Sequence, residues 1–180
     1  LMTINLNLEL IDKFRDKVNE RSIFSDKYIN IGNKNKWNLI CSAMDWITIT
    51  VEGLPLINLK GTSKGPGYDS LQSLNLVQYI ISIDILVQSI IQLYRVLYES
   101  TTYSLENDKS IFNQEKISDD TYFKHIRAIF GAHPVNLTSL DGVAQKKGER
   151  FFASWVTEDH LGDKDFSVFL YILGYYPPPV

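Results

Sequence analysis

The stretch SLQSLNLVQYIISIDILVQSIIQLYRVLYE, residues 70–99, decides the fold because it carries apolar residues at helical spacing along its whole length. Asp69 or Ser70 is a suitable N-cap. The recurring apolar positions are Leu71, Leu74, Val77, Ile81, Ile85, Ile91 and Leu97. The polar residues that interrupt them are Asn75, Gln78, Ser82, Gln92 and Glu99. They leave one narrow polar stripe, which predicts a central helix surrounded by other helices on most sides.

A membrane-spanning helix is the alternative for so apolar a segment. Polar and charged side chains interrupt it too often for that interpretation: Gln78, Asp84, Gln88, Gln92 and Arg95. We therefore expect a soluble, central helix and no membrane partner.

Three further segments show helical periodicity. Residues 6–21 place Leu10, Phe14 and Val18 on one face, and residues 36–52 repeat the pattern, although the run 47–51 would also suit a strand. The expected buried positions of this second segment are Trp37, Ile40, Cys41, Met44, Ile47 and Val51. The last helix begins at Ser118 or Asp119 and closes at Gly131 and Pro134, with a buried stripe of Tyr122, Ile126, Ile129 and Phe130.

After Gly148 the sequence changes to two short runs rich in aromatic and β-branched residues, which predict a β-hairpin. The expected fold class is mostly α, a four-helix up-and-down bundle with an appended C-terminal antiparallel β-hairpin. The expected domains are the bundle at 1–148, the hairpin at 149–173 and a tail or linker at 174–180. Aromatic side chains on both hairpin faces favour a protein contact over base stacking, since only Arg150 and Lys164 supply nearby positive charge.

Composition excludes some classes of function. The chain has 180 residues, is 44% hydrophobic and carries a net charge of −3, so no global basic excess attracts nucleic acid and any RNA contact must be local. Its one cysteine, Cys41, lies in a helical apolar pattern and is expected to be a buried structural thiol. With no signal peptide recognised, a cytoplasmic location is expected.

The clearest chemical motif is Arg127-Ala128-Ile129-Phe130-Gly131-Ala132-His133. An arginine followed after five residues by a histidine, late in a helical domain of this size, resembles the HEPN family of small helical bundles. The resemblance implies a metal-independent endoribonuclease of toxin or defence type. It implies a homodimer with a composite site between two copies, Arg127 and His133 as catalytic residues, and no cofactor or metal. RNA is then the substrate, and a neutralising protein is a further partner.

The residue types fit that chemistry on their own. Histidine titrates near neutral pH and can move protons, while the arginine fork matches two phosphate oxygens. Two features of the chain do not fit the motif of the HEPN family. Ala128 stands where family motifs usually have a polar residue, and on an unbroken helix His133 would lie about 120° from Arg127. Both side chains share one cleft only if the helix ends near Gly131.

Other interpretations of these residues remain open. His133 can simply interact with the last helical carbonyls while Arg127 pairs with a carboxylate. The chain can also be a non-catalytic relative, an interaction or regulatory domain that dimerises and binds a protein or nucleic acid. The acidic residues near His160 and the glycine-rich loop 61–67 are weaker candidates for a cation and an anion site, for which a solvated turn and a connector are preferred. His125 is expected to be partly buried and hydrogen-bonded.

Overall fold

Two compact units make up the chain in the computed structural model. Unit 1 comprises Leu1–Ile57 and Ser82–Tyr103, and unit 2 comprises Asn58–Ile81 and Ser104–Val180. The structure describes residues 6–20, 22–29, 31–32, 34–60, 70–112, 115–131, 139–140, 143–144, 150–157 and 167–173.

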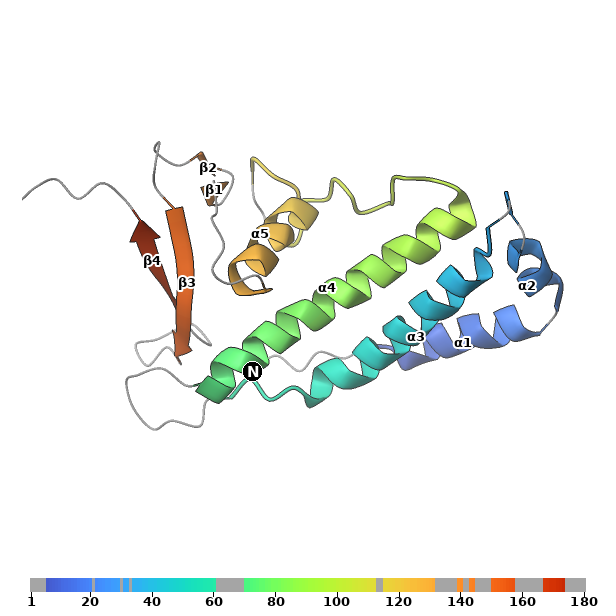
Figure 1. Ribbon diagram of the computed structural model, residues 1–180, viewed down its shortest axis with the longest axis horizontal. Coiled ribbons are helices and arrows are strands. Elements are labelled where there is room, and N and C mark those ends of the chain that lie inside the picture. The colour runs from blue at the N-terminus through green and yellow to red at the C-terminus, as the bar shows by residue number, and fades with distance from the viewer. Residues whose placement is uncertain are drawn as a thin grey trace, which may run out of the picture. The chain divides into compact units, whose positions relative to one another are not determined.

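Five α-helices, one short 3-10 helix and four strands follow one another in these residues (Figure 1). The helices are α1 (Leu8–Asn19), α2 (Ser22–Ile29), α3 (Trp37–Gly53), η1 (Leu54–Leu56), α4 (Ser70–Tyr98) and α5 (Asp119–Gly131). The strands are β1 (Ser139–Leu140), β2 (Val143–Ala144), β3 (Arg150–Thr157) and β4 (Ser167–Leu173).

The core of unit 1 is built around α3. Helices α1, α2 and α3 contact one another, and α3 runs antiparallel to the C-terminal part of α4 (Figure 1). Ile40 is fully buried at the centre of this core. The other buried members of the cluster are Ile11, Val18, Tyr28, Met44, Ile47, Val51 and Val96. Their helical spacing gives α3 one continuous apolar stripe, which explains why this helix is central to unit 1.

A polar bridge joins α1 to α3 at the edge of that core. The Arg15 guanidinium donates to the Asp45 carboxylate at 2.8 Å and to the Thr48 hydroxyl at 3.2 Å. The Thr48 hydroxyl in turn donates to the Met44 carbonyl at 3.0 Å. These bonds orient α1 on α3 more than they stabilise it, since Arg15 and Asp45 are partly exposed to water.

Unit 2 packs the N-terminal part of α4 against α5. Leu76 and Ile80 are buried one helical turn apart, and Leu59, Phe123 and Ile126 pack against them. Gln72, one turn before Leu76, is buried as well, and its amide nitrogen donates to the Leu59 carbonyl at 3.2 Å. This bond holds the segment before α4 against the helix.

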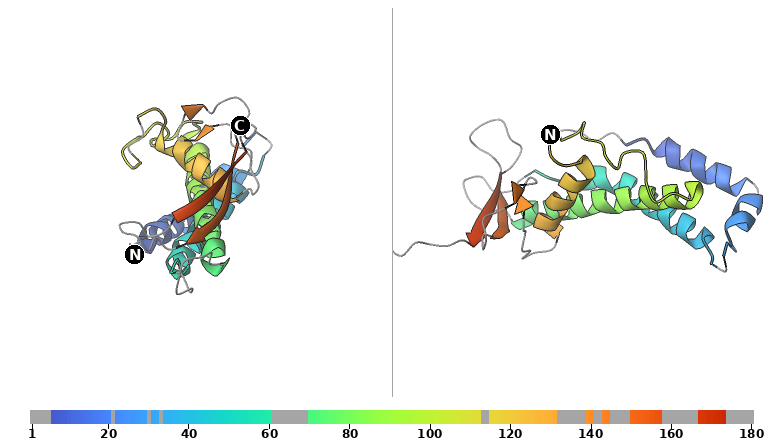
Figure 2. Two further views of the ribbon diagram at one scale, coloured as in Figure 1. Left: turned by 90° about the vertical axis from the view of Figure 1, so that its left-hand side faces the viewer. Right: turned by 90° about the horizontal axis from the view of Figure 1, so that it is seen from above.

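Strands β3 and β4 form an antiparallel pair in unit 2, as Figures 1 and 2 both show. The register runs from Arg150 opposite Leu173 to Thr157 opposite Ser167, with an irregularity between Ala153 and Val156. The two-residue strands β1 and β2 form a second antiparallel pair.

The predicted fold class, a four-helix up-and-down bundle with an appended β-hairpin, is wrong, although the chain is mostly helical as expected. The described residues hold five α-helices, because residues 22–29 form α2, whose apolar residues have no clear period. The buried faces also belong to two cores. Helices α1, α2 and α3 share one with the C-terminal part of α4, whereas α5 and the β3–β4 pair belong to unit 2.

Helix α4 is also less enclosed than its sequence predicts. Leu71, Leu74 and Ile90 are 53%, 68% and 50% exposed, whereas the buried residues of its first half are Gln72, Leu76 and Ile80. Leu10 of α1, expected in the core, is likewise 67% exposed, and Ile11 is buried in its place. In a sequence so rich in leucine and isoleucine, several stripes look equally apolar, and only packing selects the buried one.

A buried carboxylate secures the start of α5. Asp119 is 7% exposed, and its two oxygens accept hydrogen bonds from the backbone N–H groups of Ile111 at 2.9 Å and Phe112 at 3.0 Å. The backbone N–H of Asp119 donates to the Asp108 carbonyl at 2.7 Å. The loop before α5 is therefore tied to the helix at both the backbone and the side chain.

We expect Ile40→Ala to lower the free energy of unfolding by about 2 to 5 kcal/mol, because it opens a cavity in the centre of unit 1. The same change at Ile49, on the same helix but 55% exposed, should cost less than about 0.5 kcal/mol. Urea unfolding followed by circular dichroism measures both. Equal losses in the two variants would contradict the assignment of the buried stripe.

We expect Asp119→Ala to lower the free energy of unfolding by about 1.5 to 3 kcal/mol, since two backbone N–H groups lose a charged acceptor. The control is Asp120→Ala, which removes only an ion pair with the exposed Lys124 and should cost about 0.5 kcal/mol. Urea unfolding compares the two variants. A loss in Asp119→Ala no greater than in the control would exclude the capping role.

Candidate functional site

Arg127 lies on α5, one residue after Ile126, which packs against the core of unit 2. Its side chain is exposed. Helix α5 ends at Gly131, so Arg127 stands near its C-terminal end, on the solvent side of a helix held by Phe123 and Ile126.

His133, the other predicted catalytic residue, lies outside the described residues, as do the cluster around His160 and the loop 61–67. Within the described residues the structure therefore does not bring Arg127 together with a second catalytic group. The expectation that the two side chains share one cleft therefore stays a prediction.

His125, two residues before Arg127, is partly buried as expected. Its Nδ1 atom is shielded from solvent and has no hydrogen-bond partner among the described residues, so the expected hydrogen bond is not found at that atom. No group of three or more His, Cys, Asp or Glu side chains in the described part of the chain could hold a metal ion.

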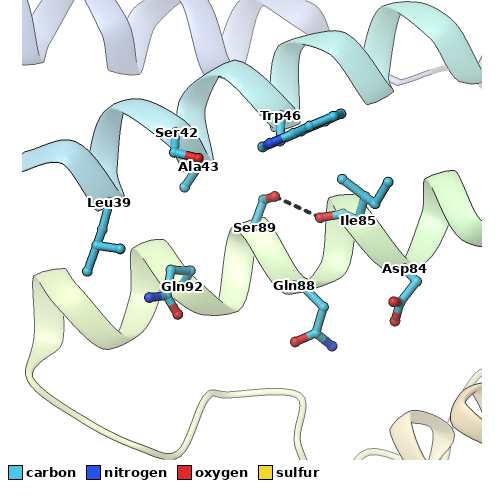
Figure 3. Close-up of a pocket in the computed structure, with 9 residues that line it drawn as sticks. All are labelled: Leu39, Ser42, Ala43, Trp46, Asp84, Ile85, Gln88, Ser89 and Gln92. Carbon is cyan, nitrogen blue, oxygen red and sulfur yellow. Dashed lines mark hydrogen bonds between the residues drawn. The ribbon is translucent and has the colours of Figure 1, made fainter.

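The structure adds a feature that sequence reasoning missed, a groove in unit 1 between α3 and α4, here called the α3–α4 groove (Figure 3). Its volume is about 380 Å³. The lining residues are Leu39, Ser42, Ala43 and Trp46 of α3 and Asp84, Ile85, Gln88, Ser89 and Gln92 of α4. Figure 3 shows the Ser89 side chain between the two helices and the indole of Trp46 at the edge of the groove, whereas Asp84 and Gln88 extend from the other side of α4.

The floor of the groove is formed by small side chains. Ala43 and Ser89 are 4% and 8% exposed, and the Ser89 hydroxyl donates to the Ile85 carbonyl of its own helix at 2.7 Å (Figure 3). That bond satisfies the hydroxyl proton inside the helix. The floor therefore offers a mostly apolar contact surface.

The walls of the groove are exposed apolar side chains of α3. Leu39 and Trp46 are 42% and 45% exposed, and Ile49, three residues further along, is 55% exposed. The sequence contains a signal for them, because residues 39, 46 and 49 fall within about 80° of one another on the helix. Residues 39 and 46 lie about 100° from the buried Ile40 and Ile47, respectively, and residue 49 lies nearly opposite them. A second apolar stripe beside a buried one indicates that the helix contacts something more than its own core.

Two described segments are long and apolar enough to cross a bilayer, Trp37–Leu56 with a mean hydropathy of 1.3 and Ser70–Tyr98 with 1.7. In the apolar 18-residue stretch of each segment, 39% and 22%, respectively, is buried. Core helices of soluble proteins also satisfy this criterion of length and composition. The cytoplasmic location and the lack of a membrane partner stay predictions.

Cys41 lies on α3 at the edge of the unit 1 core and is partly buried. Burial raises the pKa of its thiol, and the nearby Asp45 carboxylate raises that pKa further. Because the thiolate is the nucleophilic form, this environment suits a structural thiol and disfavours a catalytic one.

Comparison of the chain with protein-family models, curated proteins and solved structures finds no match. Functional conclusions therefore rest on the residues and their geometry.

We expect the Cys41 thiol to react slowly with iodoacetamide at neutral pH, because its raised pKa keeps it protonated. The rate of alkylation of the folded protein, measured by mass spectrometry from pH 6 to pH 10, should keep rising beyond the usual thiol pKa near 9.0. The urea-unfolded chain is the control and should react faster. A rate that levels off below pH 8 in the folded protein would contradict the prediction.

Proposed function

We propose that the chain is a HEPN-like, metal-independent endoribonuclease of toxin or defence type that acts as a homodimer, with Arg127 and His133 as its catalytic residues. The supporting observation is the exposed position of Arg127 near the C-terminal end of α5. The sequence motif supplies the resemblance to the family.

In the proposed reaction the RNA 2′-oxygen attacks the adjacent phosphorus, and the bond from phosphorus to the 5′-oxygen breaks. One histidine takes the 2′-hydroxyl proton, and an acid returns a proton to the leaving 5′-oxygen. His133 of each copy would fill these two roles across a twofold interface. Arg127 would hold the charge on the phosphorane oxygens. The products are a 2′,3′-cyclic phosphate and a 5′-hydroxyl end.

A second candidate function is a non-catalytic interaction or regulatory domain. The observation that favours it is the apolar surface of α3, where Leu39, Trp46 and Ile49 are each more than two fifths exposed beside the α3–α4 groove. Contiguous exposed apolar surface is typical of sites that bind other proteins or ligands.

We expect the purified 180-residue chain to cleave RNA in the presence of EDTA, and Arg127→Ala and His133→Ala each to lower the rate by a factor of about 10² or more. Arg127→Ala removes the group proposed to hold the phosphate, and His133→Ala removes the group proposed to transfer protons. Gel analysis of labelled RNAs, with detection of 2′,3′-cyclic phosphate ends, measures cleavage.

Lys124→Ala is the matched control, since Lys124 is another exposed cation on α5 and forms an ion pair with Asp120. It should keep the rate within about twofold. Circular dichroism and urea unfolding show whether each variant is folded. Undiminished cleavage in both folded variants, or no cleavage of any RNA by the unmodified chain, would refute the nuclease and favour the interaction domain.

A further inference from the structure

We propose that the outer edge of β4 binds the same edge of a second copy of this chain, so that two β3–β4 pairs form one four-stranded antiparallel sheet across a twofold axis. This inference deepens the proposed function: it rests on the homodimer stated there and names the surface through which the two copies meet. Its test needs no RNA.

Strand β4 has an edge that pairs with no other described strand. Within the described residues the sheet consists of β3 and β4 alone, so each strand has a partner on one side only (Figure 1). On the open side of an antiparallel pair, every second residue directs its backbone N–H and C=O groups away from its partner. A further strand would satisfy these groups by the same kind of hydrogen bond that joins β3 to β4.

The two strands differ in how well their edges suit such pairing. Strand β3 begins with the charged Arg150, its pairing is irregular between Ala153 and Val156, and α5 contacts it. Charges and irregularities of this kind keep a strand edge from pairing with another chain. Strand β4, SVFLYIL at 167–173, contains no charged residue, proline or glycine. The edge of β4 is therefore the one that favours a further strand.

A second copy of β4 fits this edge by symmetry. A twofold axis perpendicular to the sheet makes β4 an antiparallel neighbour of itself and keeps each face of the sheet on the same side. All seven residues overlap when Leu170 lies opposite Leu170 of the second copy, which places Val168 opposite Ile172. This register brings no like charges together, because β4 carries none.

The second copy also widens an apolar face. Val168, Leu170 and Ile172 occupy alternate positions and therefore share one face of β4. Their partners on β3 are Val156, Ala153 and Phe151, respectively. Each paired position on this face is thus apolar in both strands. Since two strands alone are marginally stable in water, a sheet of four strands with one continuous apolar face gives the dimer a physical advantage.

The proposed sheet ends at two copies. Its outer strands are β3 of each copy, with Arg150 and the irregular segment on each. These features disfavour the addition of further strands, so the pairing closes as a dimer and does not continue into a fibre.

The test places a cysteine at the centre of the proposed interface. In a Cys41→Ala background, Leu170→Cys should form a disulfide between two copies on mild oxidation, because opposite residues of neighbouring strands lie about 4.5 to 5.5 Å apart. The matched control is Ala153→Cys, which lies opposite Leu170 on β3. Its two copies would be three strand spacings, or about 14 Å, apart. Non-reducing gel electrophoresis should show at least tenfold more cross-linked dimer for Leu170→Cys.

Charged variants test whether residue 170 meets its own copy. Leu170→Lys and Leu170→Glu each place two like charges opposite each other and should raise the Kd of the dimer more than tenfold in sedimentation experiments. An equal mixture of the two variants should form a heterodimer, because each lysine then lies opposite a glutamate. Circular dichroism shows whether each variant is folded, and two variants that merely unfold would not restore the dimer on mixing.

Three outcomes would overturn the interface: a chain that sediments as a monomer, a dimer in which Ala153→Cys cross-links as readily as Leu170→Cys, or assembly into polymers larger than a dimer. The nuclease fails separately. A chain that dimerises through residue 170 and cleaves no RNA supports this interface and refutes the nuclease. Cleavage by a monomer overturns the interface and leaves Arg127 and His133 as the proposed catalytic residues.

Discussion

One helix contributes buried residues to both units of this protein. The first half of α4 buries Gln72, Leu76 and Ile80 in unit 2, and its second half buries Ser89, Ile91 and Val96 in unit 1. A helix of 29 residues is about 44 Å long, which is more than one small core needs. Helix α4 thus supplies buried residues to each unit, and several of its other apolar residues are exposed.

In unit 1, one face of α3 is buried and a neighbouring apolar face is partly exposed. The face of α3 that contains Ile40 is buried in the core of unit 1. The neighbouring face, with Leu39 and Trp46, lines the α3–α4 groove. Leu39 and Trp46 are 42% and 45% exposed, whereas the small Ala43 and Ser89 between α3 and α4 are buried. Exposed apolar side chains lower the solubility of a protein, and binding of a partner to this face of α3 would explain their presence.

The two proposals use different parts of the chain and different chemistry. The proposed nuclease would use Arg127 of α5, in unit 2, together with His133. The α3–α4 groove of the second candidate function lies in unit 1. Each can also hold without the other.

The sequence by itself determined the helices with strong periodicity, since α3, α4 and α5 begin and end within a few residues of their expected bounds. The motif formed by Arg127 and His133 is also visible in the sequence alone. Tertiary structure alone decided that Ile11 is buried instead of Leu10, that residues 22–29 form α2, and that two cores replace one bundle. The reason is physical. Periodicity depends on neighbours within one helix, whereas the choice among several apolar stripes, and the groove beside Trp46, depend on which other helix packs there.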